Sequence, residues 1–257
     1  MNRLYRLFKL LIWVFLMNSC SDSEQNKTVF EPKVKPEKHK DLETYSKKHI
    51  KLQLRIPNSE KFNFKIYKEF LDDDEKIDAI ITVNRMEFAL IEANKSPNPA
   101  KKAELGFTGN YNYIFYYDGG LDLISPPIAI PSSPVAPLKL EFKNISSGDF
   151  KDVLIDFRIR NACYKDIYTV SNHTPRRIFQ WKNFDGLGNK NVEAYSIQLS
   201  AIGQYSNVKD LLIYEGSIET PPKDADVNTY EPKIKATNKL IHTFFYLEKE
   251  GKYFTKK

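Results

Sequence analysis

Polar and apolar residues alternate over several short segments of the chain, a pattern typical of half-buried β-strands. In segment 50–56 every second residue is isoleucine or leucine, with lysine, glutamine and arginine between them. An aromatic segment, 111–117, is followed by Asp118-Gly119-Gly120, a sequence typical of a hairpin turn. Further strands are expected at 62–70, 80–83, 138–142, 195–199 and 240–246. The pattern therefore predicts a mainly β fold.

One stretch has helical periodicity instead. Met86, Leu90 and Ala93 recur on one face of a helix that we expect to cover 86–95. A proline follows shortly afterwards, which favours a helix end at this point. The sequence thus predicts one helical insertion in the β fold, near 86–105.

The first twenty residues differ from the rest of the chain. A basic start is followed by the uninterrupted apolar segment 10–17, two small or polar residues and Cys20. This order is typical of a secretory signal, and the apolar segment is far shorter than the roughly 20 residues that cross a bilayer. It resembles the signal of bacterial lipoproteins with its lipobox, which implies cleavage before Cys20 and acylation of its thiol and new amino group. A plain secretory peptide is the alternative.

The same resemblance implies a location. Ser21, not an aspartate, follows Cys20, which in such lipoproteins favours the outer membrane over retention in the inner membrane. Asp22 and Glu24 resemble a short signal that sends some bacterial lipoproteins to the cell surface. We expect an outer-membrane lipoprotein, held by its acyl chains, whose domain faces either the periplasm or the exterior.

Residues after Cys20 are polar, rich in lysine and without apolar periodicity. Such a composition is typical of a flexible chain, whose reach over 28 residues is about 30 Å. The expected organisation is a signal peptide at 1–19, an acylated flexible tether at 20–48 and a single β-rich domain at 49–257.

The net charge does not indicate a nucleic-acid-binding protein. The chain has 39 basic and 33 acidic residues. Removing Arg3, Arg6 and Lys9 with the signal leaves 36 against 33, a net charge of about +3. The remaining lysines gather near the two ends and do not interleave with aromatic residues in a recognisable binding motif.

A short pattern occurs three times in the β-rich region. In each copy a lysine comes shortly before an aspartate, and an apolar strand containing isoleucine follows. The aspartates are Asp78, Asp152 and Asp210. The pattern resembles the FG-GAP or VCBS-type repeats of β-propellers and integrin-like heads. The resemblance implies three similarly built units, and hence an incomplete propeller-like or sandwich arrangement of antiparallel sheets.

In that family, aspartates spaced two residues apart bind Ca²⁺, and a glycine allows the tight turn between them. Here Asp72, Asp74 and Asp78 occupy ligand positions, but Phe70 replaces the first aspartate and Glu75 replaces the glycine. Calcium binding by these three residues is one interpretation. The other is that Asp78, with Asp152 and Asp210, accepts hydrogen bonds from amides of the preceding turn and fixes the start of a strand.

Residues for covalent or metal catalysis are not arranged in a known motif. The four histidines are scattered. Cys163 is the single thiol that remains if Cys20 is acylated, so no intrachain disulfide is expected. Its place in a predicted strand and turn favours a structural cysteine over a nucleophile. Tyr111, Tyr113 and Tyr117 share one face of the aromatic strand with Phe115. These tyrosines and Trp181 are candidates for partner binding or for core packing.

Together these features favour a non-catalytic β-rich lipoprotein module that binds a protein or glycan partner in the cell envelope. The alternative is an envelope-associated hydrolase that acts on a polymer. Two converging carboxylates in a cleft would favour the hydrolase. The sequence indicates no cofactor, apart from the calcium that the repeat resemblance implies.

Overall fold

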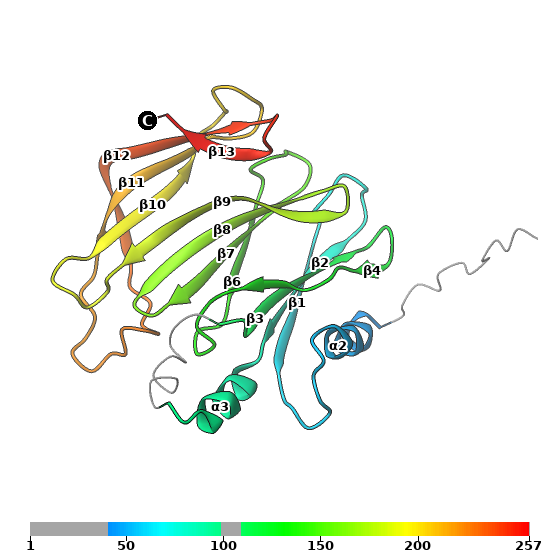
Figure 1. Ribbon diagram of the computed structural model, residues 1–257. Coiled ribbons are helices and arrows are strands. Elements are labelled where there is room, and N and C mark those ends of the chain that lie inside the picture. Colours follow the sequence, from blue (N-terminus) through cyan, green and yellow to red (C-terminus); the bar gives the residue numbers. More distant parts are fainter. Residues whose placement is uncertain (1–40, 99–108, 257) are drawn as a thin grey trace, which may run out of the picture. The chain divides into compact units, whose positions relative to one another are not determined.

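The structure of the protein, a computed structural model, describes residues 41–98 and 109–256 (Figure 1). The predicted signal peptide, Cys20, most of the predicted tether and the end of the helical insertion lie outside these residues. The described part contains two helices and strands β1 to β13. No helix within it is long and apolar enough to span a bilayer.

The first sheet is antiparallel and has the strand order β1-β2-β3-β4, with β5 also paired to β3. Its strands are β1 (Asn63–Glu69), β2 (Asp78–Asn84), β3 (Asn112–Asp118), β4 (Leu123–Ile124) and β5 (Ile128–Ile130). Helix α3 (Met86–Lys95) follows β2 and confirms the helix predicted at 86–95. It ends at Ser96, whose backbone is extended because a proline follows.

The second sheet is also antiparallel, and its eight strands are ordered as in the sequence. The strands are β6 (Lys139–Lys143), β7 (Asp152–Ile159), β8 (Ala162–Ser171), β9 (Thr174–Asp185), β10 (Glu193–Leu199), β11 (Leu211–Ile218), β12 (Ile234–Leu247) and β13 (Lys252–Thr255). Strands β9 and β10 pair through only two residue pairs. Beyond that short contact, β10–β13 diverge from β6–β9 (Figure 1).

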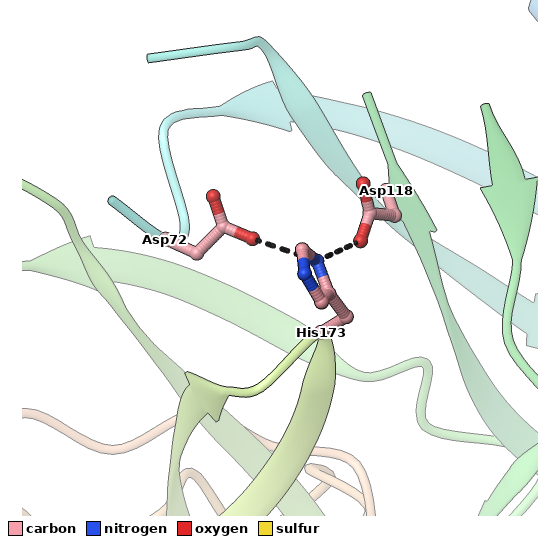
Figure 2. Close-up of side chains that lie close together, drawn as sticks. All are labelled: Asp72, Asp118 and His173. Atoms are coloured by element: carbon pink, nitrogen blue, oxygen red, sulfur yellow. Dashed lines mark hydrogen bonds and ion pairs between the residues drawn. The ribbon is translucent and has the colours of Figure 1, made fainter. Parts of the chain in front are cut away.

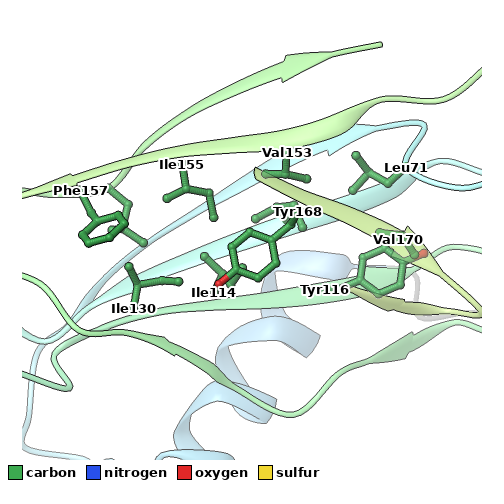
Figure 3. Close-up of a cluster of buried hydrophobic side chains, with 11 residues drawn as sticks. Leu71, Ile114, Tyr116, Ile130, Val153, Ile155, Phe157, Tyr168 and Val170 are labelled. Carbon is green, nitrogen blue, oxygen red and sulfur yellow. The ribbon is translucent and has the colours of Figure 1, made fainter. Parts of the chain in front are cut away.

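The two sheets pack face to face through one buried apolar cluster (Figure 3). Ile80 and Ile114 of the first sheet lie in this cluster with Val153 and Ile155 of β7 and Tyr168 of β8. Burial of apolar area of this kind contributes about 25 cal/mol per Å² to folding. The mainly β prediction is confirmed, and the two sheets form a sandwich.

Strand β7 is buried on both of its faces. Leu154 points away from Val153 and Ile155 and joins a second cluster with Leu211 and Ile213 of β11. This explains why the middle of β7, Val153 to Ile155, is continuously apolar and does not alternate. Strands β6–β9 therefore lie between the first sheet and strands β10–β13.

The prediction of a strand at 50–56 is wrong, because helix α2 (Leu42–Gln53) covers most of this segment. Asp41 caps the helix by accepting a hydrogen bond from the Glu43 amide, at 3.1 Å. Ile50 is fully buried against the outer face of the first sheet, whereas Leu52 is 72 % exposed. The alternating residues of this segment therefore lie in a helix that buries Ile50 on one side and leaves Leu52 in solvent on the other. The folded part also begins before residue 49, so the predicted tether is too long at its C-terminal end.

The three aspartates of the repeated pattern lie at corresponding places in three β-hairpins. Asp78 and Asp152 are the first residues of β2 and β7, and Asp210 directly precedes β11. Each carboxylate accepts a hydrogen bond from an amide six or seven residues earlier. The donors are Leu71 for Asp78, Ile145 and Ser146 for Asp152, and Gln204 for Asp210. Each hairpin turn is thus closed onto the start of its second strand.

Successive hairpin turns are also joined to one another. The Lys151 amide donates to the Phe70 carbonyl at 2.9 Å, and the Lys209 amide donates to the Ile145 carbonyl at 3.2 Å. In both cases the donor directly precedes the strand-starting aspartate of the later hairpin. The three turns consequently lie next to one another, in the order in which they occur in the chain.

Candidate functional site

Four carboxylates and one histidine gather where the first hairpin turn meets the end of β3. Figure 2 shows three of these side chains, Asp72, Asp118 and His173. Asp72 and Asp74 come from the β1–β2 turn, Asp78 from the start of β2 and Asp118 from the last position of β3. His173 comes from the tip of the β8–β9 hairpin and reaches across from the second sheet. We call this group the carboxylate–histidine cluster.

The β1–β2 turn is shaped by its own aspartates. Asp72 Oδ1 accepts from the Asp74 amide at 3.2 Å, and Asp74 Oδ1 accepts from the Lys76 amide at 2.7 Å. Glu75 between them has a φ of 58°, a left-handed conformation that usually favours glycine. Glu75 therefore adopts a backbone conformation that is more common for glycine than for other residues.

Asp78 joins this turn to the neighbouring strand. Its Oδ2 accepts from the Leu71 amide at 3.1 Å, and its Oδ1 accepts from the Gly119 amide at 2.9 Å. The side chain is almost completely buried. These two bonds hold the start of β2 and the end of β3 in register with the turn.

His173 is presented by a two-residue hairpin loop. Asn172 and His173 have φ values of 50° and 57°, as two-residue β-hairpin turns require at both central positions. The imidazole Nδ1 lies 2.7 Å from Asp118 Oδ2 and 3.8 Å from Asp72 Oδ2. Figure 2 shows the ring between the two carboxylates.

The cluster carries more buried negative charge than its surroundings neutralise. Asp72, Asp78 and Asp118 are at most 8 % exposed. Among the described residues, no lysine or arginine forms an ion pair with these three or with Asp74. His173 is the cationic partner that the described residues supply.

The pKa values of these groups are raised, mainly by burial. Burial raises the pKa of Asp78 to about 6, and the nearby Asp72 carboxylate adds to the shift. Burial also raises the pKa of Asp72 and that of Tyr116, whose hydroxyl donates to Asp72 Oδ2 at 2.9 Å. The hydrogen bond to Asp118 raises the pKa of His173.

The donor set fits a divalent cation. One ligand atom from each of Asp72, Asp74 and Asp78 lies within 4.8 Å of the others, and the same holds for Asp72, Asp118 and His173. Carboxylate oxygens are the ligands that Ca²⁺ prefers. The second group was not predicted from the sequence, since its members are far apart in the chain and Asp118 was assigned only to a turn.

The predicted aromatic residues do not form an open binding surface. Tyr113 and Tyr117 lie half-buried beneath helix α2, in a cluster with Phe115 and Ile50. Tyr111 packs against Phe88 with ring centroids 6.3 Å apart. This face of the first sheet is therefore covered.

Trp181 is likewise half-buried, on the inner side of β9. Its ring packs edge-on against Tyr195, His242 and Phe244. Its indole nitrogen is enclosed and has no hydrogen-bond partner within 41–98 and 109–256. Trp181 thus belongs to the interior of the second sheet.

An exposed apolar face lies instead on the outside of strands β10–β13. Phe245 and Phe254 are directly paired across β12 and β13, on the face opposite Phe244 and Tyr253, which are in the core. Tyr205 packs edge-on against Phe245 at 5.0 Å and is 50 % exposed, and Phe254 is 43 % exposed. We call Tyr205, Phe245 and Phe254 the outer aromatic face.

Cys163 is buried, and burial raises its pKa to about 11. The thiol is therefore neutral at physiological pH, which agrees with a structural cysteine and not with a nucleophile.

Comparison of the chain with known proteins gave no match: no protein-family model, no curated protein and no solved structure is significantly similar to it.

Proposed function

We propose that this protein is a lipoprotein held in the outer membrane by acyl chains on Cys20, and that its β-rich domain binds a protein partner without catalysing a reaction. The lipobox-like order of residues before Cys20 supports the anchor. The main support for partner binding is the exposure of the outer aromatic face.

The outer face of β10–β13 differs from the outer face of the first sheet. Helix α2 covers the first sheet there, with Ile50 as its buried anchor. Among the described residues, no helix or sheet packs over Phe245 and Phe254 in the same way. Exposed apolar patches on soluble domains mark interaction sites.

The composition of the face favours a protein partner. Tyrosine and phenylalanine are enriched in protein interfaces because they bury a large area at little cost in conformational entropy. Lys256 lies over the rings of Tyr205 and Phe245, at 5.1 and 5.6 Å, and places a positive charge at the rim. A core of aromatic rings with a charged rim is the usual anatomy of an interface.

The proposal is tested by capture from the native envelope with the full acylated chain as bait. The double variant Tyr205→Ser/Phe254→Ser should lose its partner. Leu123→Ser removes an apolar side chain of similar exposure, 56 %, from the first sheet and should retain the partner. Equal capture by both variants, or capture of polysaccharide without protein, would contradict the proposal.

A hydrolase acting on an envelope polymer is the second candidate function. It is favoured by one observation: Asp72 and Asp118 converge on His173, beside Asp78 with its pKa near 6. A carboxyl group with such a pKa is suited to proton transfer. The three cavities described around Pro137 and Asn84 are lined by other residues, so they do not provide a cleft at this cluster. Release of fragments from isolated envelope polymer, abolished in Asp118→Asn, would establish the hydrolase instead.

A further inference from the structure

A cavity of about 300 Å³ lies between strands β7–β9 and the segment 229–234. Phe157, Phe184 and Ile234 contribute apolar walls, and Asp156, Arg158 and Asn183 contribute polar groups. The volume is within the range of small-molecule sites, which combine apolar walls with a few polar groups. None of these residues belongs to the carboxylate–histidine cluster or to the outer aromatic face.

Most charges in the cavity wall are neutralised within the protein. Asp156 forms an ion pair with Lys165 at 2.7 Å and accepts a hydrogen bond from Asn183. Glu231 forms an ion pair with Lys139. These pairs leave no net charge on the wall apart from that of Arg158.

Arg158 is the exception, because among the described residues no carboxylate lies within ion-pair distance of it, and Glu231 and Asp226 act on its charge only from further away. The residue is only 7 % exposed. Its Nη atoms donate to the carbonyls of Val227, Tyr230 and Arg160, at 2.6, 2.9 and 3.3 Å. Its Nε is enclosed and finds no acceptor among the described residues.

A buried guanidinium without a direct ion pair is costly, because it has lost its hydration and the more distant carboxylates Glu231 and Asp226 offset this loss only in part. Guanidinium groups pair most favourably with carboxylates, through charge-assisted hydrogen bonds. Phe184 stacks on Arg158, with the guanidinium carbon 4.7 Å from the ring centroid, and holds the group at the cavity wall.

We propose that this cavity binds a small carboxylate with a compact apolar body, and that Arg158 supplies the counter-charge for its carboxylate. The apolar body would lie against Phe157, Phe184 and Ile234. This inference does not depend on the proposed partner binding, since the two sites share no residue.

The test uses benzoate as the probe and benzamide as its neutral counterpart of the same shape. Binding to the isotope-labelled protein is followed by NMR titration. Benzoate should shift resonances around the cavity and saturate in the millimolar range, and benzamide should bind at least about tenfold more weakly, which is 1.4 kcal/mol. Ala136 lines the cavity, so Ala136→Leu should abolish benzoate binding by filling it.

Arg158→Lys retains the charge but not the planar group, and it should weaken benzoate several-fold. If this variant does not fold, Ala136→Leu still decides the question, because it leaves Arg158 unchanged. Leu123→Ser, at an exposed residue that does not line the cavity, is the matched control and should bind benzoate as the unaltered protein does. The proposal is overturned if benzoate does not saturate, if benzamide binds equally well, or if Ala136→Leu leaves benzoate binding unchanged.

Discussion

The imidazole Nδ1 of His173 lies 2.7 Å from Oδ2 of Asp118, and this contact joins the tip of the β8–β9 hairpin to the end of β3. The two residues are 55 positions apart in the chain and belong to different sheets. Besides the apolar cluster between the sheets, the sandwich therefore has an ionic contact at its edge. That contact depends on the protonation of one histidine.

Replacing His173 by glutamine should reduce stability in a pH-dependent manner. The pKa of His173 is raised in the folded protein by Asp118, with smaller effects from Asp72 and Asp74. The stabilisation is therefore fully present below the unfolded pKa of about 6.5 and is lost as pH rises through the higher folded pKa. The difference in urea midpoint between the unaltered protein and His173→Gln should be largest near pH 6 and smallest near pH 9. A difference that is constant over this range would show that the contact is not ionic.

Asp152 should be far more important for stability than the neighbouring Asp149. Asp152 is fully buried and accepts from the Ile145 and Ser146 amides, at 3.0 and 2.7 Å. Asp152→Ala leaves these donors unsatisfied and should lower the free energy of unfolding by about 2–3 kcal/mol. Asp149 is exposed in the same turn, so Asp149→Ala should change it by less than about 0.5 kcal/mol. Similar losses in urea unfolding of the two variants would contradict this assignment.

Calcium should stabilise the folded protein through the carboxylate–histidine cluster. The cation would relieve the repulsion among Asp72, Asp74, Asp78 and Asp118, and at 100 times its dissociation constant it would add about 2.7 kcal/mol. The pKa of Asp78 is about 6, so protons compete with calcium and the rise in melting temperature should be greater at pH 7.5 than at pH 5. Asp72→Asn should remove the response, and Asp149→Asn should retain it. A melting temperature that calcium leaves unchanged at pH 7.5 would exclude the site.

The sequence predicted the β-strands well where one face is buried and the other is exposed. Segment 62–70 alternates and forms β1, and the helix at 86–95 was predicted with its correct bounds. Segment 50–56 alternates equally well but belongs to α2, because a seven-residue pattern does not show that Leu52 is left in solvent. Local periodicity cannot distinguish these cases, since tertiary packing decides which apolar residues are buried.

The sequence predicted only some of the residues of the carboxylate–histidine cluster. Asp72, Asp74 and Asp78 lie within seven residues, so their spacing alone indicated a shared loop. Asp118 and His173 reach the same place through sheet pairing and through a hairpin of the other sheet. Contacts of this kind follow from the topology of two sheets, which a single sequence does not specify.

Cys20→Ala should release the protein from the membrane. Acyl chains on Cys20 would bind the bilayer stably because two or more chains act together, and the alanine variant has no thiol to acylate. In detergent phase separation, the unaltered protein should enter the detergent phase, and the variant should either enter the aqueous phase or accumulate uncleaved. Unchanged partition of a cleaved variant would falsify the lipoprotein assignment.

Site-specific photo-crosslinking from Phe254 in intact cells tests the central claim, partner binding through the outer aromatic face, most directly. The full acylated chain would carry a photoreactive phenylalanine at position 254, and in a matched strain at Leu123, which is similarly exposed on the first sheet. Our account predicts one protein adduct of defined mass from position 254 and none from position 123. The absence of an adduct at 254, or the same adducts at both positions, would contradict it.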